Sequence, residues 1–449
     1  MTMTVTETLA DFVVRNRLED IPRNVYNESL RALVNYMGCA IGGAAEPALD
    51  VAIDTLLPYA REGSTGILGR SETCDPLYAA LFNGIGSHVH EYDDTLPKNY
   101  IHPSIPVASA LFAYAGANKV GGREFVQAFI LGFDIESRIG NAVYPAHYEA
   151  GWHITSTTGV MGAAVAIGKL LGLTTKQMIW ALGIAATQAA GIREMFGSMA
   201  KSFQPGRAAQ NGYTAALLAK RDYTAGERVL EGPRGFAAVT AATYDLDKAV
   251  DRLGEHFELM DNAYKPYACG LVVHPTIDAC SQIRAKYGID PQSITKVELK
   301  VAPLVLDLCN KSDLRRALES KYSIYHAAAI GLARGKGGLL EFTDEAIADP
   351  VLARLRSITT AAADDGVTED QVDVTVHVES GEPVHFFLEA SLGNVERPLS
   401  NAQLDEKFRD QSVLVLPQLQ VDELLAATWA IEELSDVGKV VKLARRNAA

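Results

Sequence analysis

Five short polar segments interrupt an otherwise apolar chain, and they hold the residue types that acid–base chemistry needs. The first, HVHEYDDTLPKNYIHPS over 88–104, combines three histidines, three acids and a lysine. It begins at the end of an expected helix, where Glu91 and Thr95 would lie one turn apart if the helix continued, and it places His102 just before a proline. Imidazoles and carboxylates exchange protons near neutral pH, so the segment indicates either an acid–base site or a solvated helix end.

The second and third segments place a histidine and two cations at expected helix starts. His153 lies in HYEAGWHITSTTG before a long apolar helix, where it would serve either as an acid or base or as a helix cap. In SMAKSFQPGRAAQNGYTAALLAK, we expect the helix to open at the Pro-Gly-Arg run that ends at Arg207, with Lys201 in the loop before it. A helix start flanked by two cations suits a carboxylate ligand, although two solvated surface cations would give the same pattern.

The last two segments add a lysine and a tyrosine. Lys265 lies in NAYKPYACGLVVHPTIDA at an expected domain junction, and clefts between domains are common ligand sites. Tyr325 lies at the start of an apolar helix in SKYSIYHAAAIGLARG. The ordinary alternatives are an exposed linker lysine and a buried tyrosine whose hydroxyl bonds a backbone carbonyl.

Metal, nucleotide and disulfide chemistry have little support in the sequence. The 5 cysteines are scattered without a CxxC pair, and the 10 histidines form neither HExxH nor a zinc-finger spacing. We find no GxxxxGK[ST], and no GxGxxG between a strand and a helix. We therefore expect a reducing cytoplasmic location, no metal, and catalysis by side chains without a cofactor.

The net charge and the hydropathy of the sequence argue against two classes of partner, nucleic acids and membranes. The formal net charge is −14, from 55 acidic and 41 basic residues, which argues against nucleic acid or an anionic membrane as the main partner. No apolar run reaches the ~18 residues of a membrane span, and MTMTVTETLADF lacks the pattern of a secretory signal. An anionic small molecule could still bind where a few lysines or arginines converge.

The sequence pattern of the 449 residues changes near residue 265, and this change predicts which elements position the five segments. Up to about residue 265 the chain favours alanine- and glycine-rich helices, which we expect over 76–94, 104–117, 158–173 and 176–190. Beyond it we expect a strand at 297–303, a helix at 323–334 and a hairpin at 373–389, with helices returning after 403. The predicted fold is mainly α with an inserted α+β domain: an all-helical domain from 1–266 and 403–449, and a smaller α+β lid domain at 267–402.

None of the five segments alone is typical of one protein family, but their combination and order are. HEYDDT…HP, GWHITSTTG, SMAKSFQPGRAAQNG, YKPYACG…HP and KYSIYHAAA together resemble the MmgE/PrpD family over nearly the whole length, and GNVERPLSNAQLDEKF resembles that family's closing segment. Its members include 2-methylcitrate dehydratase, cis-aconitate decarboxylase and iminodisuccinate epimerase. The resemblance implies an all-helical domain built from both termini, an α+β lid domain with a cleft between them, a homodimer, and no metal or organic cofactor.

The resemblance also implies the residues of the site. The implied catalytic residues are His102, His153, Lys201 and Lys265, and the implied substrate-binding residues are Glu91, Thr95, Arg207 and Tyr325. Three positions depart from the family. The family often has Asp in place of Glu91 and His in place of Gln204, and Leu96 stands where the dehydratase branch has Trp.

The three family activities share one chemical problem. Each makes or quenches negative charge at a carbon next to a carboxylate, on a substrate with two or three carboxylates. Cations must stabilise that charge, and imidazoles must exchange the proton. We expect a lyase acting on a small di- or tricarboxylate, with dehydration of a methylcitrate-like acid first, epimerisation of an imino- or hydroxy-dicarboxylate second and decarboxylation third. From another class, a non-catalytic dicarboxylate-binding protein is the alternative.

Overall fold

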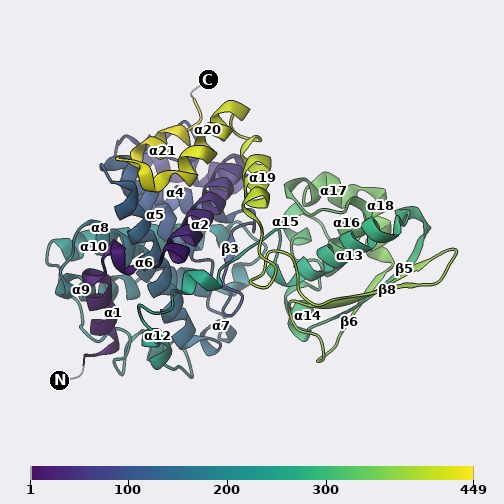
Figure 1. Ribbon diagram of the computed structural model, residues 1–449, viewed down its shortest axis with the longest axis horizontal. Coiled ribbons are helices and arrows are strands. Elements are labelled where there is room, and N and C mark those ends of the chain that lie inside the picture. Colours follow the sequence, from purple (N-terminus) through teal and green to yellow (C-terminus); the bar gives the residue numbers. More distant parts are fainter. Residues whose placement is uncertain (1–2, 448–449) are drawn as a thin grey trace. The chain divides into compact units, whose positions relative to one another are not determined.

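The computed structural model describes residues 3–447, which form two compact units (Figure 1). The first unit comprises Met1–Val89, Asp93–Asn262 and Asn401–Ala449, and the second comprises His90–Tyr92 and Ala263–Ser400. The first is helical and drawn from both ends of the chain, and the second combines helices with a sheet. The prediction of a mainly α fold with an inserted α+β part is confirmed.

Helices make up nearly all of the regular structure in the first unit. They are α1 (Val5–Arg15), α2 (Arg23–Gly42), α3 (Pro47–Leu56), α4 (Pro76–His88), α5 (Ser104–Ala117), α6 (Gly122–Val143), α7 (Ala146–Glu149), α8 (Ile154–Leu170), α9 (Thr175–Ala186), α10 (Ala200–Lys220), α11 (Phe236–Thr240), α12 (Asp247–Val250), α19 (Asn401–Ser412), α20 (Gln418–Trp429) and α21 (Gly438–Leu443). A short antiparallel pair, β1 (Thr65–Gly66) and β2 (Thr73–Cys74), and the two-residue strand β3 (Asp94–Thr95) complete it.

The core of the first unit lies around α5 and α8, which are buried along almost their whole lengths. Both helices consist mainly of small and apolar residues without a continuous polar stripe, as expected of helices surrounded by other helices. Small residues bring the axes together: a Cβ added at Gly84 of α4 would lie 2.4 Å from the Cα of Gly206 in α10. The two helices therefore cross at a point where neither has room for a side chain.

The second unit is built on one sheet with the strand order β6-β5-β7-β8. Its strands are β5 (Ile294–Val301), β6 (Thr359–Ala363), β7 (Val372–Val378) and β8 (Val384–Leu388), and its helices are α13 (His274–Tyr287), α14 (Pro303–Cys309), α15 (Ala317–Ser320), α16 (Ile324–Arg334), α17 (Asp344–Ala348) and α18 (Pro350–Ser357). Strand β5 runs parallel to β6 and antiparallel to β7, while β7 and β8 form the predicted hairpin. Helix α13 packs against β7 and β8, and α16 packs against α13 and β6 (Figure 1).

Helix α4 begins where the sequence predicts but ends six residues early. The Asp75 carboxylate accepts hydrogen bonds from the amides of Leu77 and Tyr78, and a proline fills the first helical position. The helix ends at His88, and Glu91 has a φ of 56°, in the left-handed region. The predicted continuation to residue 94 is wrong, because it would place three carboxylates at the negative end of the helix dipole.

Helix α10 differs in the opposite sense, because it begins at Ala200 rather than at the Pro-Gly-Arg run. Lys201 therefore lies in the first helical turn, and the prediction that it lies in a loop is wrong. Pro205 lies inside the helix, where its missing N–H leaves one carbonyl of the helix without its usual donor. No helix among residues 3–447 is long and apolar enough to cross a membrane.

Candidate active site

Three histidine rings lie together in the first unit, each at the end of a different helix. His88 is the last residue of α4, while His102 and His153 lie just before α5 and α8. The His88 ring centroid is 5.1 Å from that of His102 and 5.8 Å from that of His153. The structure therefore brings the two histidines singled out in the sequence to one place, with a third between them that sequence reasoning missed.

Asp93 links two of these rings. Its fully buried carboxylate places Oδ2 3.0 Å from Nδ1 of His88 and 3.0 Å from Nδ1 of His102. The His102 Nδ1 also lies 2.8 Å from the backbone oxygen of Asp94. A carbonyl oxygen only accepts, so Nδ1 of His102 carries the proton and the lone pair of the neutral ring is on Nε2.

His88, Asp93 and His102 also have the side-chain types that bind metal ions, and their ligand atoms lie within 4.8 Å of one another. A metal bound to Nδ1 of His102 would have to replace the proton that this atom donates to the Asp94 carbonyl. The donor set fits a hydrogen-bonded aspartate–histidine pair better than it fits a metal centre.

His153 is held in the same tautomer by different partners. Its Nδ1 lies 3.0 Å from Oε1 of Gln204 and 3.1 Å from the Ser156 hydroxyl. The Gln204 amide nitrogen donates to the carbonyl of Ile192 at 3.1 Å, which turns the amide oxygen towards the ring. Nδ1 of His153 thus donates, and its lone pair is on Nε2. Although His153 occupies the N-cap position of α8, its side chain makes no capping hydrogen bond, contrary to the helix-cap alternative.

Of the other candidates in the first unit, Lys201 shares a neighbour with His153, the ring of Phe196, whereas Arg207 bonds within its own helix. The Lys201 ammonium lies 5.1 Å from the Phe196 ring centroid, and that ring meets His153 edge-on at 5.4 Å. Arg207 is exposed and donates to Gln210, three residues along the same helix. Thr95 is buried, and its hydroxyl makes no hydrogen bond within the described residues, so it is available to a ligand.

The second unit brings two further candidates together. Nζ of Lys265 lies 3.7 Å from Oε2 of Glu91, with the two side chains 1% and 7% exposed. Glu91, read from the sequence as a substrate contact, is therefore the ionic partner of Lys265. Tyr325 is half-buried and donates to Oδ1 of Asn310 at 2.6 Å, so a side chain rather than the expected backbone carbonyl satisfies its hydroxyl.

Two buried carboxyl groups lie in the core of the first unit. Asp94 accepts hydrogen bonds from Ser104 at 2.5 Å and Asn262 at 2.8 Å, yet burial raises its pKa to about 6. Glu136 on α6 is fully buried, and neither of its oxygens has a hydrogen-bond partner within residues 3–447. Burial and the charge of Asp94 raise its pKa well above the ordinary value.

Replacing Asp94 with Asn should flatten the dependence of stability on pH. As the pH rises from about 4 to 6, the carboxyl ionises in the unfolded chain before it does so in the folded one, so the free energy of unfolding falls by about 3 kcal/mol. Asn keeps acceptors for Ser104 and Asn262 but cannot ionise, so Asp94→Asn should lose this decrease. Denaturant unfolding at a series of pH values measures it, with Asp410→Asn, at an exposed site, as control. Parallel curves for Asp94→Asn and the wild type would contradict the expectation.

Comparison with protein-family models assigns the chain along most of its length. The MmgE/PrpD N-terminal domain model matches residues 7–249, and the MmgE/PrpD C-terminal domain model matches residues 267–431. The chain belongs to the MmgE/PrpD family. The resemblance drawn from the five polar segments is confirmed. The two matched ranges cover seven of the eight residues that it singled out, and Lys265 lies between the ranges.

Several curated members of the MmgE/PrpD family match this member from end to end. It is 26% identical to the cis-aconitate decarboxylase of Aspergillus terreus, over 98% of this chain and 95% of that protein. It is 24% identical to the cis-aconitate decarboxylase of Homo sapiens, over 99% and 95% of the two chains. It is 22% identical to the 2-methylcitrate dehydratase of Cupriavidus necator, over 94% and 92%.

Proposed function

We propose that this MmgE/PrpD member is a lyase that transfers a proton at a carbon next to a carboxylate of a small polycarboxylate. The observation that carries the proposal is the pair of imidazoles, His102 and His153, each with Nδ1 donating to a fixed acceptor and its lone pair on Nε2. The relatives support the substrate class, since their names refer to small tricarboxylic acids.

The roles of the side chains follow from their charge and hydrogen bonding. Asp93 holds His102 by Nδ1 and stabilises the imidazolium that forms when Nε2 takes up a proton. Lys201, which like His153 contacts the Phe196 ring, supplies positive charge for a carboxylate that gains electrons as an enediolate. In a decarboxylation the C–C bond breaks, its electron pair stays on carbon, and an imidazolium donates the proton that quenches it. In a dehydration one neutral imidazole takes the carbon-bound proton on Nε2. The other imidazole, already protonated on Nε2 as an imidazolium, gives its proton to the departing hydroxyl.

Among these reactions, we propose decarboxylation of a cis-aconitate-like tricarboxylate first. The supporting relatives are cis-aconitate decarboxylases of fungal and mammalian origin, which match nearly the full chain. Leu96 in place of the dehydratase tryptophan argues against dehydration. Dehydration of a methylcitrate-like acid is the second candidate, because a 2-methylcitrate dehydratase also matches.

The test measures turnover of a panel of acids by NMR. The panel contains cis-aconitate, 2-methylcitrate, malate and aspartate-derived acids. We expect cis-aconitate to lose carbon dioxide at the highest rate, and dialysis against EDTA to leave that rate unchanged. Water loss from 2-methylcitrate as the fastest reaction would favour the second candidate. Binding without turnover across the whole panel would contradict a catalytic role.

A further inference from the structure

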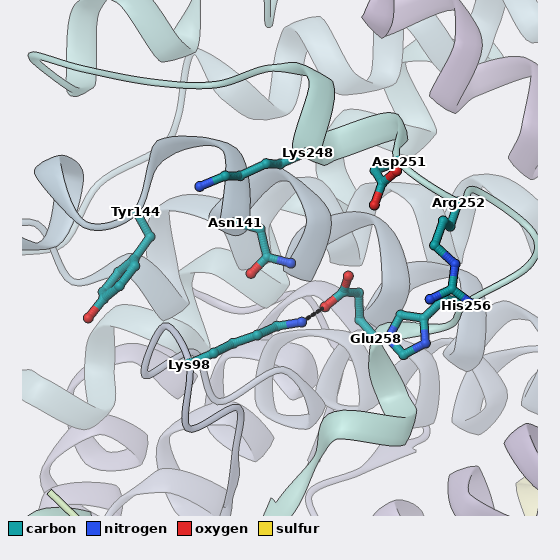
Figure 2. A pocket seen from close by; sticks show the side chains of 8 residues that line it. All are labelled: Lys98, Asn141, Tyr144, Lys248, Asp251, Arg252, His256 and Glu258. Atoms are coloured by element: carbon teal, nitrogen blue, oxygen red, sulfur yellow. Dashed lines mark ion pairs between the residues drawn. The ribbon is translucent and has the colours of Figure 1, made fainter. Parts of the chain in front are cut away.

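A polar pocket of about 370 Å³ lies in the first unit, at a place that the proposed chemistry does not use (Figure 2). Three long cations line it: Lys98 from the loop before α5, Lys248 from α12, and Arg252 just after α12. None of its lining residues is among the eight candidates from the sequence or the His88–Asp93 pair.

On one side of the pocket, two acidic side chains neutralise the charge of Lys98. The Lys98 ammonium contacts the buried Glu258 carboxylate and lies 2.8 Å from Oδ2 of Asp261, which is also 3.2 Å from Nε2 of His256. Although burial opposes it, the attraction of these two acids raises the pKa of Lys98. His256, Glu258 and Asp261 could by type hold a metal ion, but the ammonium occupies the position that a cation would take.

The other side of the pocket has cationic side chains that form no ion pair within the described residues. Lys248 and Arg252 are exposed and form no ion pair with any residue from 3 to 447. Figure 2 shows the Lys248 amino group extending over Asn141. The Asn141 side-chain oxygen accepts from Asn99 at 2.7 Å, and Figure 2 shows the amide nitrogen of Asn141 directed among the other lining side chains. Asp251 supplies one negative charge, so the groups without partners carry a net positive charge.

We infer that this pocket binds a small oxyanion, through Lys248, Arg252 and the Asn141 amide. Cations without counter-ions around a concave site favour carboxylate or phosphate oxygens, and the Arg fork binds either kind in two-point fashion. Because Lys248 and Arg252 are exposed, the attraction is screened by salt, and affinity falls as ionic strength rises. Free polycarboxylates and inorganic phosphate share this chemistry, and the experiment separates them.

The pocket is joined to the loop that carries His102. Asn99 donates to Asn141, and its own side-chain oxygen accepts from the amide of Ile101 at 3.1 Å, next to His102. Lys98 ties the same loop to Glu258 and Asp261. An oxyanion held by Asn141 therefore stabilises this loop in the conformation that presents His102. The effect on turnover rests on the proposed function, whereas the binding itself does not.

The experiment is calorimetric titration of the full chain with inorganic phosphate and, separately, with citrate, at low ionic strength. The double variant Lys248→Met/Arg252→Met should weaken binding at this pocket by at least ~10-fold, a sum of two charged contacts. Asp251→Asn, which removes the one opposing charge, should tighten it. The matched control is Lys439→Met/Lys442→Met on α21, which removes two exposed charges elsewhere in the first unit and should change nothing.

The possible results distinguish the two anions, and they also distinguish failure of the pocket from failure of its link to His102. Citrate binding that the Lys248/Arg252 variant weakens more than it weakens phosphate binding assigns the pocket to polycarboxylates, and the reverse assigns it to phosphate. Equal weakening in the α21 control would reduce the effect to net charge and overturn the inference, as would unchanged binding of both anions in the Lys248/Arg252 variant. Binding of Mn²⁺ that Lys98→Met strengthens would overturn it in favour of a metal site. Anion binding with no effect on turnover would retain the pocket and remove only its link to His102.

Discussion

His102→Asn should lower kcat by ~10²–10⁴-fold, the range for loss of a general acid or base. The amide nitrogen of Asn takes the place of Nδ1, so it can still donate to the Asp94 carbonyl and to Asp93. What the variant loses is Nε2, the atom to which we assign the proton transfer. KM should change far less, because the cations provide most of the attraction for substrate carboxylates.

The matched control for His102→Asn is His385→Asn, which removes an exposed imidazole on β8 that pairs with Asp373. Its turnover should equal that of the wild type. Thermal unfolding of both variants separates lost chemistry from lost folding. A His102→Asn protein that unfolds at the wild-type temperature and keeps kcat within about tenfold would remove His102 from the reaction.

His153→Asn should produce a loss of the same size, ~10²–10⁴-fold in kcat. Asn can keep the hydrogen bond to Oε1 of Gln204, so a purely structural His153 would be replaced almost without effect. The two histidine variants should differ in their pH–rate profiles, because each retains the limb that belongs to the other group. Identical profiles, or near-normal turnover of His153→Asn, would assign His153 to structure.

Gln204→Leu tests whether the hydrogen bond to Nδ1 of His153 matters while the imidazole itself is kept. Leu fills similar space but cannot accept from Nδ1 of His153 or donate to the Ile192 carbonyl. The ring should then lose its fixed tautomer, and kcat should fall while His153 itself remains. We expect the loss to be smaller than that of His153→Asn, because the Ser156 hydroxyl still contacts Nδ1.

Local signals in the sequence were enough for many elements. The helix expected over 104–117 coincides with α5, and Asp75 followed by proline marks the start of α4. The alternation of valines predicted β7, whose Val372, Val374 and Val376 are buried. In each case the capping residue or the apolar period acts within one element, so no knowledge of its neighbours was needed.

The arrangement of the site depends on packing between segments that are distant in sequence. His88 was hidden inside a helix expected to continue to residue 94, and only its early end places the ring beside His102. The Glu91–Lys265 ion pair joins residues far apart in the chain and requires a left-handed backbone at a glutamate, which no local preference favours. The role of Gln204 appeared only when its amide was seen between Ile192 and His153.

The central claim is that imidazoles of this protein move a proton at a carbon next to a carboxylate, and the most direct measurement is the reaction in D₂O followed by NMR. The wild-type protein should form product with one solvent deuterium at that carbon, placed on a single face. His102→Asn and His153→Asn should lose the label together with turnover. A decarboxylation product of cis-aconitate that contains no solvent deuterium, or that carries it equally on both faces, would contradict the account.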